Sequence, residues 1–161
     1  MAELLKEIYH ETFLTDFGKL VQTVEPQFKT QDFVNTVLAA PWETLALKQR
    51  TRKIAQVLGQ YLPHDYPTAL AKLVQIAPQC QGFAYLFMPD FVVAYGDLQV
   101  DWSRSMRALA CFTQQSSAEF AIRSFILADP KRAMQQLNQL AQSDNDHFRR
   151  LASEGCLPRL P

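Results

Sequence analysis

The sequence predicts an all-α fold: a HEAT-like-repeat α-solenoid in which antiparallel helix pairs stack into a right-handed superhelix. Apolar residues recur at helical spacing in one segment after another, and no segment shows convincing strand alternation. Only five glycines occur, and the prolines recur where helices should begin or end. Such helix pairs carry more apolar surface than each pair can bury alone, so neighbouring pairs stack. We therefore expect a single HEAT-like helical-repeat domain over residues 1–161, with a compact helical bundle as the alternative.

The longest predicted helix covers about residues 43–62. Its apolar stripe has a 3.6-residue period and must pack against neighbouring helices. The stripe consists of Leu47, Ile54, Val57, Leu58 and Tyr61. Lys48, Arg52 and Lys53 lie mostly off the stripe, so their ordinary interpretation is a solvated helix face.

Further helices are predicted in the second half of the chain. A short apolar helix should follow Pro89 and carry Phe91, Val92, Tyr95 and Leu98. Longer helices are expected over 101–116, 118–128, 130–142 and about 145–154. The apolar residues of helix 118–128 are Phe120, Ala121, Phe125 and Ile126.

The last two predicted helices have the pattern of a HEAT-like repeat. Asp129 suits an N-cap, and Pro130 suits the first helical position, where its missing N–H costs nothing. A polar turn over 143–146 follows, and the next helix carries Phe148 near its start. This order of an Asp-Pro start, a short polar turn and a second helix is typical of HEAT-like repeats.

Composition argues against several classes of protein. No apolar run approaches the ~20 residues of a membrane span, and the acidic, helix-prone start is unlike a signal peptide. We therefore expect a cytoplasmic protein with no membrane partner. The cysteines at positions 80, 111 and 156 and the scattered histidines lack metal-site spacing, so we expect no metal. The three cysteines are interpreted as buried small apolar residues.

The formal net charge is zero, from 16 basic and 16 acidic side chains. A neutral total counts mildly against nucleic-acid binding, which usually leaves a basic footprint. The distribution is uneven, however, because residues 48–53 hold four basic side chains and no acidic one. These bases and those after residue 104 are able to line one face of a solenoid.

Three stretches of the second half carry a family resemblance. They are Phe-Ala-Tyr-Leu-Phe-Met-Pro-Asp-Phe at 83–91, Thr-Gln-Gln-Ser-Ser-Ala-Glu-Phe-Ala-Ile-Arg at 113–123, and His-Phe-Arg-Arg-Leu-Ala-Ser-Glu-Gly at 147–155 with Pro-Arg-Leu-Pro at 158–161. The last stretch is the most specific. Together they resemble the AlkC-like family of HEAT-repeat DNA alkylation repair glycosylases, over most of the chain but sharply only after about residue 80.

The resemblance implies a function in base excision repair. Its members hydrolyse the N-glycosidic bond of cationic alkylated purines such as 3-methyladenine, without a metal or organic cofactor. The partner implied is double-stranded DNA containing alkylated purines, held on the concave face. The family lacks the snug pocket into which other glycosylases extrude the base.

Two glutamates, Glu119 and Glu154, match the family's catalytic carboxylates. A methylated purine is already cationic, so the barrier is the positive charge that grows at C1′ of the sugar. One carboxylate can stabilise that charge, and a second can orient and deprotonate the attacking water. We expect the two to lie within roughly 10 Å of each other, the scale on which two carboxylates share a sugar and a water. Their ordinary interpretations are a helix N-terminal glutamate and a helix-end acid.

The candidate DNA-binding residues come from the basic run and from the family motifs. They are Lys48, Arg52, Arg123, His147, Arg149, Arg150 and Arg159. We expect phosphate contacts from a shared positive surface. For Arg149 and Arg150 the alternative is an ion pair inside the solenoid, and for His147 it is a turn or cap. Trp102 is interpreted as core or rim packing.

The chain departs from the family pattern at its end. Cys156 and Leu157 stand where the family has a basic residue, and the family continues past Pro-Arg-Leu-Pro with Trp-Ala and further repeats. We therefore expect a truncated or short form with weak or absent excision, and a homodimer through the C-terminal end or poor solubility. The alternative function is a catalytically impaired HEAT-like scaffold that binds DNA or protein.

Overall fold

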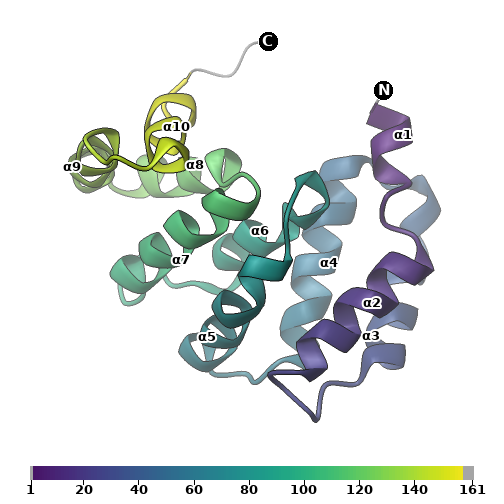
Figure 1. Cartoon of the computed structure of the whole chain (residues 1–161). Helices are drawn as coiled ribbons and strands as arrows, with labels where there is room; N and C mark the ends of the chain where they lie inside the picture. Colours follow the sequence, from purple (N-terminus) through teal and green to yellow (C-terminus); the bar gives the residue numbers. More distant parts are fainter. Residues whose placement is uncertain (1, 158–161) are drawn as a thin grey trace.

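The computed structural model describes residues 2–157, and within them it contains ten α-helices, three short 3-10 helices and no strand. This confirms the predicted all-helical fold class (Figure 1). The α-helices are α1 (Ala2–Lys6), α2 (Glu11–Gln22), α3 (Thr30–Leu38), α4 (Leu47–Tyr61), α5 (Tyr66–Ile76), α6 (Phe87–Tyr95), α7 (Trp102–Gln115), α8 (Glu119–Ala128), α9 (Pro130–Ala141) and α10 (Asp146–Gly155). The 3-10 helices are η1 (Trp42–Thr44), η2 (Ala77–Gln79) and η3 (Phe83–Tyr85).

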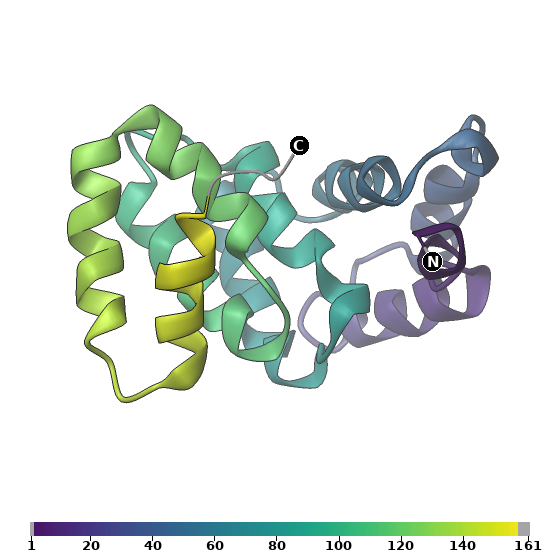
Figure 2. The same ribbon diagram turned by 90° about the horizontal axis from the view of Figure 1, so that it is seen from above.

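The helices stack in sequence order. Helices α4, α6, α8 and α10 pack against one another in turn and form one layer. Helix α5 packs against α7, and α9 packs against α8 and α10. The N-terminal helices and the α9–α10 pair lie at opposite ends (Figures 1 and 2). Because each helix contacts only near neighbours in the stack, the arrangement is a solenoid of helix pairs rather than a closed bundle.

Aromatic side chains pack the two halves of the core. In the first half, Phe87 lies edge-on to Phe17 with ring centroids 4.8 Å apart. In the second half, Trp102 lies edge-on to Phe125 at 5.0 Å. The Trp102 Nε1–H donates to Oε1 of Gln136 at 2.6 Å, so the buried indole keeps a hydrogen-bond partner. The predicted packing role of Trp102 is confirmed.

Capping residues define the repeat at the C-terminal end of the described chain. Asp129 accepts from the backbone N–H of Arg132 at 3.0 Å, and Pro130 is the first residue of α9. Asn145 caps α10, accepting from the N–H groups of His147 and Phe148. The predicted helix–turn–helix unit is therefore present, with boundaries shifted by a residue or two.

Two predicted helices differ from those observed. The segment 43–62 is divided into η1 and α4, because Ala46 is extended and its N–H is taken by Oε1 of Gln49 at 2.8 Å. Helix α6 begins at Phe87, before Pro89, and Leu98 lies beyond its end. Pro89 is tolerated in the first turn because N–H groups there have no partner within the helix.

The prediction of three buried cysteines is wrong. Cys80 is buried, and desolvation raises the pKa of its thiol to about 12. Cys111 is half-buried and Cys156, just beyond the last turn of α10, is exposed. Among the described residues, no cluster of three or more His, Cys, Asp or Glu side chains is arranged to hold a metal ion.

None of the helices described in residues 2–157 is both long and apolar enough to cross a membrane.

Arg50, on α4, connects this helix to the end of α1. We expect this connection to contribute to the stability of the fold. Its side chain is 2% exposed, donates to the carbonyl of Lys6 at 3.0 Å and lies 4.7 Å from the ring of Trp42. We expect Arg50→Met to lower the free energy of unfolding by about 2 kcal/mol, because a charged group's hydrogen bonds are lost. For a chain of this size that corresponds to a melting temperature about 4–8 °C lower.

Thermal unfolding followed by circular dichroism measures the effect. The exposed Arg107 on α7 supplies the control, and Arg107→Met should change stability by less than about 0.5 kcal/mol. Equal melting temperatures for wild type and Arg50→Met would contradict this role.

Candidate active site

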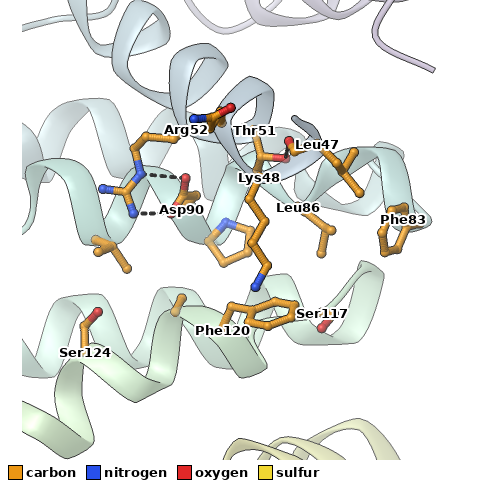
Figure 3. A pocket seen from close by; sticks show the side chains of 14 residues that line it. Leu47, Lys48, Thr51, Arg52, Phe83, Leu86, Asp90, Ser117, Phe120 and Ser124 are labelled. Carbon is orange, nitrogen blue, oxygen red and sulfur yellow. Dashed lines mark hydrogen bonds and ion pairs between the residues drawn. The ribbon is translucent and has the colours of Figure 1, made fainter. Parts of the chain in front are cut away.

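A groove of about 690 Å³ lies on the layer formed by α4, α6 and α8 (Figure 3). Helix α6 packs against both α4 and α8, so its residues form the floor and the other two helices form the walls. Most of the lining is apolar. The lining residues used below are Lys48, Arg52, Phe83, Asp90, Ser117 and Phe120.

Two predicted DNA-binding residues, Lys48 and Arg52, line this groove, and a third, Arg123, lies beside its Phe120 wall. The ammonium of Lys48 crosses from α4 to the ring of Phe120 on α8, with Nζ 4.2 Å from the ring centroid (Figure 3). The guanidinium of Arg123 lies 5.9 Å from the same ring. Arg52 donates to both oxygens of Asp90 at 2.8 and 2.7 Å, a bidentate pair that neutralises its charge within the groove.

Glu119 is the first residue of α8 and is 8% exposed. The Nε–H of Arg150 donates to its Oε1 at 3.0 Å. Its second oxygen, Oε2, is buried and has no hydrogen-bond partner among the described residues. The position at a helix N-terminus favours the negative charge, because the backbone N–H groups there are unpaired.

Arg150 is fixed by further hydrogen bonds to the end of α7. Its Nη2 donates to the carbonyl oxygens of Thr113 at 2.9 Å and Ser116 at 2.8 Å, at the end of α7. The guanidinium thus ties together α7, α8 and α10. Of the two interpretations of Arg150, the structure shows the ion pair inside the solenoid, and that pair orients Glu119.

Glu154 lies on α10, which packs against α8, the helix that carries Glu119. Arg150 and Glu154 are one turn apart on α10 and therefore share a helix face. At the adjoining Gly155, an added Cβ would lie 2.6 Å from Cγ2 of Ile122, so α10 closely approaches α8. The Glu119–Arg150 and Ile122–Gly155 contacts show that the two helices run in the same direction. The glutamates thus lie on adjacent helices, Glu119 buried and Glu154 exposed, and their catalytic roles and expected approach stay predictions.

The remaining candidates lie away from the groove lining. Arg149 pairs with Asp146, donates to the carbonyl of Ser143 at 2.8 Å, and lines a separate cavity of about 390 Å³ between α9 and α10. His147 is exposed in the first turn of α10. Arg159 lies outside the described residues. The structure therefore brings Lys48, Arg52 and Arg123 together and places Arg149 elsewhere.

Sequence reasoning missed two site residues. Phe120 was expected among the apolar residues that pack helix 118–128, yet it is 54% exposed at the groove. Its place beside Glu119 in the family motif was the available signal. Asp90 also stands in a motif, but only the tertiary structure pairs it with Arg52.

Two known proteins are similar to this chain in sequence or in fold. No family model matches the chain. It is 40% identical over all 161 residues to the uncharacterized protein YhaZ of Bacillus subtilis (strain 168), and it spans 44% of that protein. It also resembles the alkylpurine DNA glycosylase AlkC of Pseudomonas fluorescens, solved bound to DNA containing an abasic site analog. That match has a TM-score of 0.90 and 40% identity, and covers 98% of this chain and 43% of the other. In sequence and in fold, the chain is therefore similar to these two proteins, and it spans less than half the length of each.

Proposed function

We propose that this chain is part of an alkylpurine DNA glycosylase, which hydrolyses the N-glycosidic bond of cationic methylated purines such as 3-methyladenine in double-stranded DNA. The observation that carries the proposal is the burial and hydrogen bonding of the Glu119 carboxylate. One carboxylate oxygen is fixed by Arg150, while the other is buried and has no partner. A buried acceptor without a partner is costly, and a catalytic role is one of the recognised reasons for such a group in a native structure.

The chemistry needs a fixed negative charge next to the sugar. As the bond between C1′ and the purine breaks, its electron pair leaves with the base, which becomes neutral, and positive charge develops at C1′. The partnerless Oε2 of Glu119 supplies the compensating charge. Because this oxygen is shielded from water, its electrostatic effect is larger than that of an exposed carboxylate.

Glu154 takes the second role in the proposal. A water attacks C1′, its oxygen forms the new bond, and its proton passes to the Glu154 carboxylate. Glu154 suits this role because it is exposed to solvent and lies on the α10 face that carries Arg150, the partner of Glu119. The division between one stabilising and one water-activating carboxylate parallels that of inverting glycosidases.

Base release tests the proposal directly. Double-stranded DNA treated with a methylating agent is incubated with excess protein, and the freed 3-methyladenine is quantified by mass spectrometry. We expect release faster than spontaneous depurination. Release at the spontaneous rate from DNA that the protein binds would contradict glycosylase activity.

A second candidate is a DNA-binding scaffold without catalysis. The enclosure of Glu119 Oε2 favours it, because a carboxylate covered by protein does not touch a sugar until its cover moves. The same assay separates the two functions, since a scaffold binds methylated DNA without releasing its bases.

DNA binding itself should depend on salt through the groove. We expect Lys48→Met to reduce the slope of log affinity against log salt by about 0.9, the value of one phosphate contact. Fluorescence anisotropy over a range of salt concentrations measures the slope. Lys19, exposed on α2 and outside the groove lining, is the matched control, and Lys19→Met should leave the slope unchanged. Equal slopes for wild type and Lys48→Met would remove Lys48 from the DNA interface.

A further inference from the structure

Phe120 is an exposed aromatic ring in an otherwise buried stretch of α8. It is 54% exposed, whereas its neighbours Glu119 and Ala121 are 8% and 5% exposed. Its ring stands on the wall of the groove and faces α4 (Figure 3). The exposed ring is part of an apolar groove rather than a single apolar residue on the surface, and contiguous exposed apolar area of this kind marks binding sites.

The ring already serves as a cation-binding surface in the free protein. Lys48 Nζ lies 4.2 Å from its centroid, and the Arg123 guanidinium lies 5.9 Å away. The face of an aromatic ring attracts cations through its quadrupole. The two cationic side chains that α4 contributes to this groove therefore have different partners. Arg52 pairs with the Asp90 carboxylate, and Lys48 lies on the face of the Phe120 ring.

Few other residues that line the groove could bind a positively charged ligand. Asp90 is the one acidic residue among the described lining residues of the groove, and both of its oxygens are engaged by Arg52. The rest of the lining offers hydroxyls, one amide and apolar walls. A positive charge entering the groove thus finds two exposed aromatic rings, Phe83 and Phe120, and Phe120 is the ring at which the cations of the free protein lie.

We infer that Phe120 binds the positive charge of the methylated base and so distinguishes cationic purines from neutral ones. This inference rests on the proposed glycosylase function. The purinium ring takes the place of the Lys48 ammonium on the phenyl face, and that ammonium moves to a phosphate of the bound strand. After this exchange the phenyl ring still has one cation on its face, and the Lys48 ammonium has a phosphate as its new partner. A neutral purine gains no cation–π contact, so the ring loses the Lys48 ammonium and gains no other cation.

The contact between the base and the Phe120 ring would lie near the proposed catalytic carboxylate, Glu119. Phe120 follows Glu119 directly on α8, so a base held at the ring lies at the helix end that carries the carboxylate, although the two side chains leave the helix about 100° apart. The contact requires no enclosing pocket, because one exposed ring face is sufficient for stacking.

The experiment compares two duplexes that differ only in the charge of one base. One carries 7-methylguanine and the other guanine at the same position, both on a 2′-fluorinated sugar that slows base loss. Dissociation constants from fluorescence anisotropy give the preference for the cationic base. We expect wild type to prefer the 7-methylguanine duplex, and Phe120→Leu to reduce that preference by about 2- to 30-fold, the range of a cation–π contact. Phe120→Tyr retains the π face and should keep the preference.

Lys48→Met provides the second arm. Removing the competing ammonium should leave the preference unchanged or increase it, while affinity for both duplexes falls. An equal preference in wild type and Phe120→Leu, no preference in wild type, or a preference lost in Lys48→Met would each overturn the inference. Base release by the wild-type chain separately tests glycosylase activity. A Phe120-dependent preference without base release would therefore reject the activity and keep the binding site.

Discussion

Replacing Glu119 with glutamine should slow the release of 3-methyladenine by about 10²–10³-fold, the effect of removing one preorganised electrostatic stabiliser. Glutamine retains the size of the side chain and an oxygen that accepts from Arg150 Nε. It removes the negative charge that opposes the positive charge developing at C1′. The measurement is single-turnover base release with protein in excess over methylated DNA.

Binding separates a chemical effect from a structural one. Glu119→Gln should bind DNA containing an abasic-site analog with nearly wild-type affinity, because Glu119 is buried and is not expected to contact phosphates. Circular dichroism should show the same helical content. Release within threefold of the wild-type rate would refute the catalytic assignment, and Glu154→Gln then becomes the test of whether the other carboxylate acts alone.

Replacing Arg150 with methionine should affect both stability and activity. The substitution removes the hydrogen bonds to Thr113, Ser116 and Glu119 and leaves both oxygens of a buried carboxylate unpaired. We expect the free energy of unfolding to fall by about 2–3 kcal/mol, the value of hydrogen bonds to a charged group. The melting temperature should fall by about 4–12 °C. Base release should fall by at least tenfold, because Glu119 is no longer held in position.

A double-mutant cycle shows whether Arg150 acts through Glu119. The combined loss of stability in Glu119→Gln/Arg150→Met should be smaller than the sum of the single losses, because the uncompensated charge disappears with the carboxylate. Arg150→Lys should retain part of the activity, since the charge remains while the guanidinium fork is lost. Strictly additive losses would show that Arg150 stabilises the end of α7 and does not position Glu119.

Much of the local structure was predictable from the sequence. The Asp129 cap, the Pro130 helix start and the polar turn before α10 all appear as expected, because capping bonds join residues two or three positions apart. Helix boundaries were less predictable where local contacts compete. Pro89 lies inside the first turn of α6, and Gln49 caps α4 after a break.

The family motifs selected Glu119 and Glu154, but no local pattern gives their surroundings. The Arg150–Glu119 pair and the Lys48–Phe120 contact join helices far apart in sequence. These contacts depend on how α4, α6, α8 and α10 stack. The sequence by itself therefore determined the helical fold class and the caps of α9 and α10, because periodicity and capping act within a few residues, and the family motifs supplied the candidate carboxylates. Only the tertiary structure decided that Arg150 holds Glu119, that Arg52 is neutralised by Asp90 and that Phe120 faces the groove, because these outcomes depend on packing between distant segments.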